Sequence, residues 1–355
     1  MRVERTAIAA APDHRILGND QGAPDRRSAK AAKLMSHRAM KKIALITPSF
    51  RKDIERCALL CDSIDRHLSC YERHYVIVND DDMQLFANFN RPHRIVMPAA
   101  QLLPRWLKPV PSWLSRKGRR VWWSFRSKPV HGWHVQQILK IAAGLQLPEQ
   151  RFCLIDSDNV FTRPFDVSAY AGAERTPLYL DRAAIRADSP LHAGWTRNCD
   201  RLLGHKGATA FPADDYIGNI IVWDKDALAD MTRAIERATR KSWAQALCNT
   251  RAFSEYLLYG NFVRKSARHL ATHAITTESL ANAYWDATPL DSTAIAAMLN
   301  DMPEPKVALC IQSISHTPVS TIREVIGLAY VEGASVAPPS STATAREQID
   351  ARLDG

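Results

Sequence analysis

The sequence predicts an α/β fold with a mostly parallel central sheet and helices on its faces. Short apolar runs alternate with segments of helical periodicity, as expected when strands and helices alternate along a chain. The 355 residues are 46% hydrophobic, which is enough to bury a large core. The 24% of charged residues is ordinary for a folded protein and excludes a wholly disordered chain. No stretch approaches the roughly 20 apolar residues of a membrane-spanning helix.

The expected elements follow from the spacing of apolar residues, which recur every second position in a strand and every third or fourth in a helix. Strands are expected at residues 42–47, 74–78, 94–97, 151–155 and 219–223, and helices at about 52–68 and 133–145. A further strand-like run covers residues 307–314. We expect one domain over residues 41–332, with flexible tails at 1–40 and 333–355, where no period is sustained.

The net charge of +10 is concentrated in two places. Residues 1–42 contain ten basic and four acidic residues, and residues 105–128 contain eight basic residues and no acidic one. The body of the domain is therefore mildly acidic. Proteins that bind nucleic acid generally spread positive charge over a folded face, so nucleic acid is not an expected partner of this chain.

The cysteines and the N-terminus indicate the compartment. The seven cysteines are scattered, and no two of them are separated by two residues, so neither a disulfide framework nor a zinc site is expected. The apolar run near the N-terminus is too short for the core of a signal peptide. We therefore expect a cytoplasmic protein with reduced thiols.

Polar residues follow three of the expected strands, at Thr47–Ser49, Asn79–Asp82 and Asp156–Asp158. The carboxyl ends of parallel strands share one edge of the sheet, where ligands bind in such folds. Two carboxylates one residue apart can reach a single Mg²⁺ or Mn²⁺, which in turn neutralises a diphosphate. The same spacing occurs at Asp80/Asp82 and Asp224/Asp226, so only the apolar strand before Asp156 distinguishes this pair. A solvated turn is the alternative interpretation.

Residues 152–161, with Gln136, Gln137 and Lys140 in the preceding helix, resemble the metal-binding region of GT-A-fold glycosyltransferases. Residues 44–50 and 253–260, together with a late histidine, resemble a bacterial glycosyltransferase-like family of unassigned specificity. The similarity spans roughly residues 43–330 in short blocks. It implies a GT-A (nucleotide-diphospho-sugar transferase) fold, a nucleotide-sugar donor, a divalent metal and glycosyl transfer.

The resemblance assigns donor-binding roles to particular positions. The nucleotide would lie beside the turn after the first strand, the base or ribose beside a carboxylate after the second, and the phosphates beside a lysine and the residues after the fourth strand. The positions concerned are Thr47, Pro48, Ser49, Asp80, Asp81, Lys140, Asp156 and Ser157. Carboxylates accept hydrogen bonds from ribose hydroxyls. The alternatives are a polar turn at Asp80 and a solvated lysine at 140.

The metal ligands that the resemblance implies are Asp156, Asp158 and His316. A neutral imidazole suits Mn²⁺, and His316 ends the apolar run from residue 307. One histidine among twelve is otherwise an ordinary polar residue, which is the alternative interpretation.

Two acidic residues are candidates for catalysis. Glu255 lies between aromatic residues and could serve as a general base at the mouth of a cleft if the transfer inverts. Its alternative role is a first-turn glutamate in a helix capped by Ser254. Asp215 precedes Gly218 and a buried strand and would contact the sugar or acceptor; otherwise it belongs to an ordinary loop. Asp181 is a weaker candidate of the same kind.

The basic insert at 105–128 contains four of the nine tryptophans, at positions 106, 113, 122 and 123, and also Phe125. Aromatic rings with cations suit an anionic membrane surface, which would bring the enzyme to a lipid-linked acceptor. The same composition can stack on single-stranded nucleic acid. In the third interpretation the tryptophans are core residues and the arginines are solvated.

The leading prediction is therefore a metal-dependent glycosyltransferase that acts on a saccharide or lipid-linked acceptor, with peripheral membrane contact. Nucleotidyl transfer is an alternative, although the turn after the first strand lacks the expected glycines. The non-enzymatic alternative is a basic protein with a decayed transferase core that binds membrane or RNA.

Overall fold

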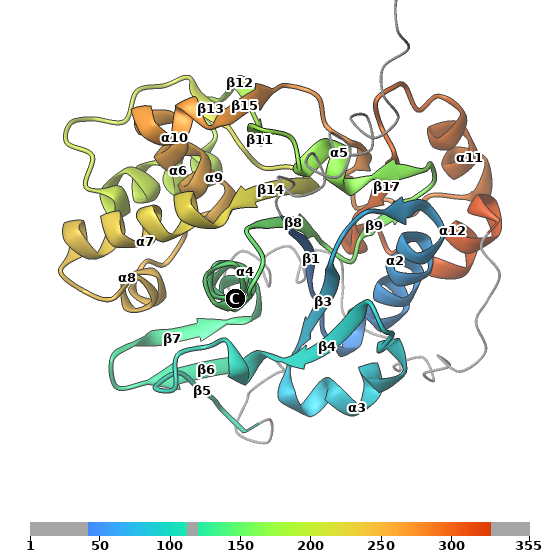
Figure 1. Cartoon of the computed structure of the whole chain (residues 1–355), viewed down its shortest axis with the longest axis horizontal. Coiled ribbons are helices and arrows are strands. Elements are labelled where there is room, and N and C mark those ends of the chain that lie inside the picture. Colours follow the sequence, from blue (N-terminus) through green and yellow to red (C-terminus); the bar gives the residue numbers. More distant parts are fainter. Residues whose placement is uncertain (1–41, 112–119, 328–355) are drawn as a thin grey trace, which may run out of the picture. The chain divides into compact units, whose positions relative to one another are not determined.

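The computed structural model describes residues 42–111 and 120–327, all of which belong to one compact unit. It is a mixed α/β structure around a five-stranded sheet of order β14-β8-β1-β3-β4 (Figure 1). Neighbouring strands pair in parallel from β8 to β4, while β14 is antiparallel to β8. The strands are β1 (Ile43–Pro48), β3 (Arg73–Val78), β4 (Arg94–Pro98), β8 (Arg151–Ile155) and β14 (Ile220–Asp224).

These bounds confirm the five predicted strands to within a residue or two, and both predicted helices are present, α2 (Ile54–His67) and α4 (Gly132–Gln146). The prediction for residues 307–314 was too long, because the chain leaves the extended conformation early. Strand β17 covers only Ala308–Ile311, and a 3-10 turn follows at Ser313–Ser315. The expected tails and Trp113 lie outside the described residues.

Helices cover both faces of the sheet because the side chains of β1 alternate between two cores. Ala44 and Ile46 lie in one cluster with Ile138 and Ile141 of α4. Ile43 and Leu45 lie in the other, with Leu60 and Ile64 of α2. Removing each of these leucine and isoleucine side chains from water contributes about 1.5–3 kcal/mol, which is why the strands read as continuous apolar runs.

The remaining elements extend these two layers. The helices are α3 (Met83–Phe86), α5 (Val167–Ala171), α6 (Pro190–Leu203), α7 (Lys225–Thr239), α8 (Trp243–Asn249), α9 (Glu255–Lys265), α10 (Ala267–Ala271), α11 (Ser292–Asn300) and α12 (Val319–Ile326). The strands, in small sheets, are β2 (Leu68–Ser69), β5 (Lys108–Pro109), β6 (Val121–Ser124), β7 (Ser127–His131), β9 (Asn159–Phe161), β10 (Phe165–Asp166), β11 (Thr176–Tyr179), β12 (Asp181–Ile185), β13 (Ala213–Asp215), β15 (His273–Thr276) and β16 (Ala281–Tyr284).

The aromatic residues of the basic insert divide between core and surface. Trp122 is buried, and Trp106 packs against the same core, as the third interpretation of the insert predicts. Trp123 and Phe125, by contrast, are exposed on the antiparallel sheet formed by β5, β6 and β7. Within the described ranges, none of the helices has the length and apolar character needed to cross a membrane.

Candidate active site at the carboxyl edge of the sheet

The three polar turns predicted to share one edge of the sheet do so. Strand β1 pairs in parallel with β3 and with β8, so the residues that follow each strand end side by side. The backbone N–H of Ser49 donates to the carbonyl of Ile77 at 2.9 Å, which fixes the first two turns to each other. Asp156 follows β8 at the same edge.

The centre of the candidate site is the ammonium group of Lys140, on α4. Its Nζ lies 2.9 Å from Oδ1 of Asp156 and 3.0 Å from Oε1 of Glu255, and it donates to the Tyr256 hydroxyl at 2.9 Å. Lys140 is therefore buried among polar partners and is not the solvated mid-helix lysine of the alternative prediction. It joins three segments: α4, the end of β8 and the start of α9.

The charges of this cluster depend on burial and on each other. Burial lowers the pKa of Lys140, but the fields of Asp156, Tyr256 and Glu255 outweigh it and hold that pKa well above its ordinary value. Burial raises the pKa of Glu255, partly offset by Lys140. One ammonium thus serves two carboxylates, and Asp156 is the one that reaches solvent, with 44% of its side chain exposed.

The structure corrects the predicted position of Glu255. Glu255 is only 3% exposed, so it does not lie at the mouth of a cleft. It is the first residue of α9, and Oγ of Ser254 accepts the N–H of Leu257 at 3.4 Å, which confirms the predicted N-cap. The backbone N–H of Glu255 donates to Oε1 of Gln137 at 3.0 Å. Its carboxylate faces Lys140, which makes it a positioning group for the cation.

A second cation, Arg56 of α2, joins Asp158 to the late segment of the chain. Its Nε lies 3.8 Å from Oδ1 of Asp158, and its two terminal nitrogens donate to the carbonyls of Ile311 and Thr317 at 2.7 and 3.1 Å. The N–H of Ile311 in turn donates to the carbonyl of Asp158 at 3.1 Å. The loop that carries His316 is therefore held next to the segment that follows β8.

The predicted metal ligands are not arranged as a three-residue site. His316 has an exposed side chain and a left-handed backbone, with φ of 55°, directly after the 3-10 turn. Over residues 42–111 and 120–327, no group of three or more His, Cys, Asp or Glu residues is placed to hold a metal ion. Mg²⁺, however, often binds through one or two carboxylates plus phosphate oxygens and water. The exposed Asp156 and the neighbouring Asp158 fit that mode, and the role of His316 stays a prediction. Ser157, between the two aspartates, is buried.

The predicted nucleotide-binding turns have different environments. Thr47 and Pro48 are buried residues of β1, and Oγ1 of Thr47 accepts from His74 Nε2 at 2.9 Å, so this side chain is bonded within the core. Asp80 and Asp81 are exposed after β3. Oδ2 of Asp80 accepts the N–H of Ala100 at 3.3 Å.

Asp80 also borders a pocket of about 100 Å³ that the basic insert completes. Leu103, Leu107, Lys108 and Trp122 are among the other residues that line it. The pocket therefore combines one carboxylate and two cations, Arg105 and Lys108, with apolar walls. The insert is fixed to this edge of the sheet by a salt bridge of 2.7 Å between Arg120 and Asp81.

Asp215 lies at the end of β13, directly opposite Asp181 of β12. Burial raises the pKa of Asp215, although the N–H of Ile217 donates to its Oδ1 at 2.9 Å. The next residue, Tyr216, packs against Gly260 of α9, where an added Cβ would come within 2.1 Å of the tyrosine ring. Helix α9 therefore supports both the Glu255 cluster and the Asp215 strand.

Sequence reasoning missed Arg56 and Tyr256, which contact the predicted carboxylate and the predicted lysine. Arg56 stands among apolar residues on the buried face of α2, and an arginine at such a position needs a polar partner. That signal was present in the helical spacing. Tyr256 carried no comparable signal, because an aromatic residue beside Leu257 is expected in the core.

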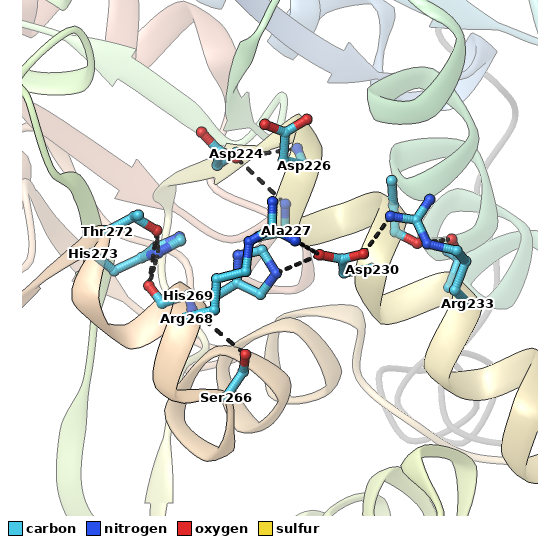
Figure 2. Close-up of polar contacts among 12 residues, drawn as sticks. Asp224, Asp226, Ala227, Asp230, Arg233, Ser266, Arg268, His269, Thr272 and His273 are labelled. Carbon is cyan, nitrogen blue, oxygen red and sulfur yellow. Dashed lines mark hydrogen bonds and ion pairs between the residues drawn. The ribbon is translucent and has the colours of Figure 1, made fainter.

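A second polar network lies at the opposite edge of the sheet (Figure 2). Asp224, the last residue of β14, caps α7 by accepting the N–H groups of Asp226 and Ala227 at 3.1 and 3.3 Å. Its own N–H donates to the Tyr259 hydroxyl, which contacts His273 Nε2 at 2.9 Å. The pair Asp224/Asp226 thus repeats the spacing of Asp156/Asp158 but caps a helix.

Comparisons with known proteins give a family without a described activity. No curated protein matches the chain. The model of one family, described as a family of unknown function (DUF6492), matches residues 40–334. This match covers well over half of the chain, with the whole candidate site inside it. The chain therefore belongs to the DUF6492 family of unknown function.

Proposed function

We propose that this protein is a metal-dependent glycosyltransferase of the GT-A fold that takes its sugar from a nucleotide-sugar donor. The observation that carries the proposal is the placement of Asp156 and Asp158. They follow a parallel strand at the ligand-binding edge, and the buried Lys140 orients the exposed carboxylate of Asp156. A parallel-containing sheet with helices on both faces is the coarser architecture within which this proposal stands.

The donor diphosphate would bind at the end of β8. Asp156 and Asp158 would hold Mg²⁺ or Mn²⁺ there, with His316 as a further ligand, and the ion would neutralise the leaving diphosphate. Lys140 and Arg56 place two fixed positive charges beside the same carboxylates. They orient Asp156 and Asp158 before a ligand binds, which reduces the reorganisation needed on binding.

The nucleoside would occupy the pocket between Asp80 and the insert. Its volume of about 100 Å³ corresponds to several water positions, since each needs roughly 10–15 Å³ by this measure. The Asp80 carboxylate could accept hydrogen bonds from ribose hydroxyls, while Trp122 and Leu107 supply apolar walls for a base.

The acceptor side would include Asp215, whose raised pKa and partial exposure suit a group that exchanges a proton. Glu255 would act through Lys140 rather than on the acceptor directly. A saccharide or lipid-linked acceptor is the class that we propose, at the cytoplasmic side of a membrane.

A thermal-shift panel tests the proposal. The folded protein is heated with nucleoside diphosphates, nucleoside triphosphates and nucleotide sugars, with and without Mn²⁺, because a ligand that binds only the native state raises the unfolding temperature. We expect stabilisation by one diphosphate and its sugar conjugates only with Mn²⁺. The shift should vanish in Asp158→Asn and persist in Asp226→Asn, which changes the same spacing at the other edge.

Two results would contradict it. Stabilisation by a nucleoside triphosphate alone would favour nucleotidyl transfer. No shift with any nucleotide, in protein whose cooperative unfolding shows that it is folded, would indicate that this edge is not a donor site.

A further inference from the structure

The tip of the hairpin formed by β6 and β7 exposes aromatic side chains to solvent. Ser124 pairs with Ser127, so Phe125 and Arg126 form the two-residue turn. Phe125 is 94% exposed and Trp123 is 43% exposed, whereas Trp122 and Val130 face the core. Large apolar side chains that stay exposed at a protruding turn do not stabilise the fold. Such side chains are typical of a contact surface.

Cations surround these rings. Arg126 stands beside Phe125 in the turn, Lys128 is exposed on β7, and Lys108 of β5 pairs with Trp123 across the sheet. From residue 105 to residue 128 the sequence contains eight basic and no acidic residues. We refer to Lys108, Trp123, Phe125, Arg126 and Lys128 as the hairpin surface.

The hairpin surface is held in place by helix α8, beside β7 (Figure 1). The side chains of Gln245 and Asn249 donate to the carbonyl of Arg126 at 3.0 and 3.4 Å. The N–H of Lys128 donates to Oδ1 of Asn249 at 3.2 Å. These bonds fix the backbone of the tip before any partner binds.

We propose that the hairpin surface docks onto an anionic lipid bilayer. Phenylalanine and tryptophan rings insert at the level of the headgroups, and adjacent lysines and arginines are attracted to anionic lipids. A second copy docked through the same surface would bring like charges together, and the chain's own residues 1–42, with ten basic and four acidic residues, also carry the wrong sign.

Ring geometry favours lipid over single-stranded nucleic acid. Trp123 and Phe125 contact each other edge to face, with centroids 4.3 Å apart and planes at 71°. One ring therefore covers part of the other, and the two do not present parallel faces on which successive bases could stack. Together they form a compact apolar ridge flanked by charge. This inference is independent of the proposed donor site.

Co-sedimentation with vesicles tests the docking. The full chain is mixed with vesicles of phosphatidylcholine alone, or of phosphatidylcholine with about one-third phosphatidylglycerol, at several salt concentrations. We expect binding to the anionic vesicles only, and weaker binding as salt screens the charges.

Variants locate the contact. Phe125→Ser should weaken vesicle binding, and Arg126→Ser with Lys128→Ser should weaken it by at least about tenfold, since each cation near such a surface contributes roughly fivefold. Trp285→Ser removes an exposed aromatic residue elsewhere, and Lys206→Ser with Arg237→Ser removes two exposed cations elsewhere. Both controls should bind as the unmodified protein does.

Three results would overturn the inference: equal binding by Phe125→Ser and the unmodified protein, equal loss in the control variants, or no binding to anionic vesicles. A fluorescent oligouridylate is titrated in parallel. Binding to this RNA without binding to vesicles would assign the surface to nucleic acid. Because Phe125 is almost fully exposed, its substitution leaves the fold intact, and a thermal unfolding curve checks this.

Discussion

The two edges of the central sheet carry polar networks that share a helix and differ in purpose. At the carboxyl edge, Glu255 and Tyr256 of α9 bind Lys140, which also holds the half-exposed Asp156. At the other edge, one turn further along α9, Tyr259 accepts the N–H of Asp224. In the first network one carboxylate is open to solvent. In the second, the carboxylates cap a helix or bond to neighbouring side chains.

The side chains of the opposite network are hydrogen-bonded to one another and to nearby backbone. His273 donates from Nδ1 to the carbonyl of His269 at 2.6 Å, and Nε2 of His269 contacts Asp230 at 2.8 Å (Figure 2). Arg233 and Arg268 also bond to Asp230. Burial acts to raise the pKa of Asp230, but Arg233 and His269 outweigh it and lower that pKa. A carboxylate already bonded to two arginines and a histidine has little capacity left for a ligand. The same spacing thus has different surroundings at the two edges of the sheet: Asp224 caps α7, whereas the side chain of Asp156 is half-exposed.

Of the substitutions in the two networks, we expect the largest loss of stability at Lys140. Lys140→Met leaves Glu255 buried without its cation, and such a loss typically costs about 3–5 kcal/mol of unfolding free energy. Urea denaturation measures it. The double variant Lys140→Met with Glu255→Met removes both charges and should recover most of the loss. A single variant within about 0.5 kcal/mol of the unmodified protein would show that the pair is not buried as described.

The next effect is steric and lies at the contact between α9 and the Asp215 strand. In Gly260→Ala the new methyl would overlap the Tyr216 ring, and overpacking of this kind costs about 1–3 kcal/mol. Thermal unfolding measures the loss. Gly194→Ala, where nothing lies within 4 Å of the new methyl, is the matched control and should lose no stability. Equal unfolding temperatures for the two variants would contradict the close packing.

Breaking the helix cap at the opposite edge should have a smaller effect. Asp224→Ala removes the side chain that caps α7, which costs roughly 0.5–2 kcal/mol. It also removes an ion-pair partner 3.8 Å from the buried Arg151, which keeps its bonds to the carbonyls of Ala171 and Glu174. Nucleotide binding, if the proposal holds, should be unchanged. A loss of binding as large as that of Asp156→Asn would mean that the two edges are not separate.

The smallest effect is a pH dependence from the opposite network. Burial lowers the pKa of His273 from its ordinary value to about 4. Between that value and 6.5 the unfolded chain binds more protons than the native one, so stability falls as the pH falls through this window. We expect a contribution on the order of 1 kcal/mol between pH 6.5 and 5. The urea concentrations at the unfolding midpoints of the unmodified protein and His273→Gln should approach each other as the pH falls toward 5. A difference that does not change with pH would contradict the lowered pKa of His273.

The apolar runs in the sequence were enough to predict the strands and the edge of the sheet that they share. The apolar runs before Asn79 and Asp156 predicted both strand ends, because parallel strands in one sheet end together. They could not reveal that Lys140 is buried. That depends on Glu255, 115 residues further along the chain, and helical spacing places a lysine on a helix without identifying its partner.

The same limit explains the other differences. Arg56 binds a carbonyl 255 residues away, and nothing local to α2 indicates which segment lies there. Glu255 was expected near solvent because its neighbours are tyrosines, which often lie at cleft mouths. In the structure the Tyr256 hydroxyl accepts a hydrogen bond from Lys140, so this tyrosine is part of the buried cluster and does not line a cleft mouth.

The most direct measurement of the central claim is calorimetric titration of the Mn²⁺–nucleoside diphosphate complex, identified by the thermal panel, into two variants. Asp156→Asn changes the exposed carboxylate at the carboxyl edge, and Asp224→Asn changes a buried carboxylate at the opposite edge. We expect metal-dependent binding to disappear in the first variant and to be unchanged in the second. Equal affinities in both variants would contradict a donor site at Asp156.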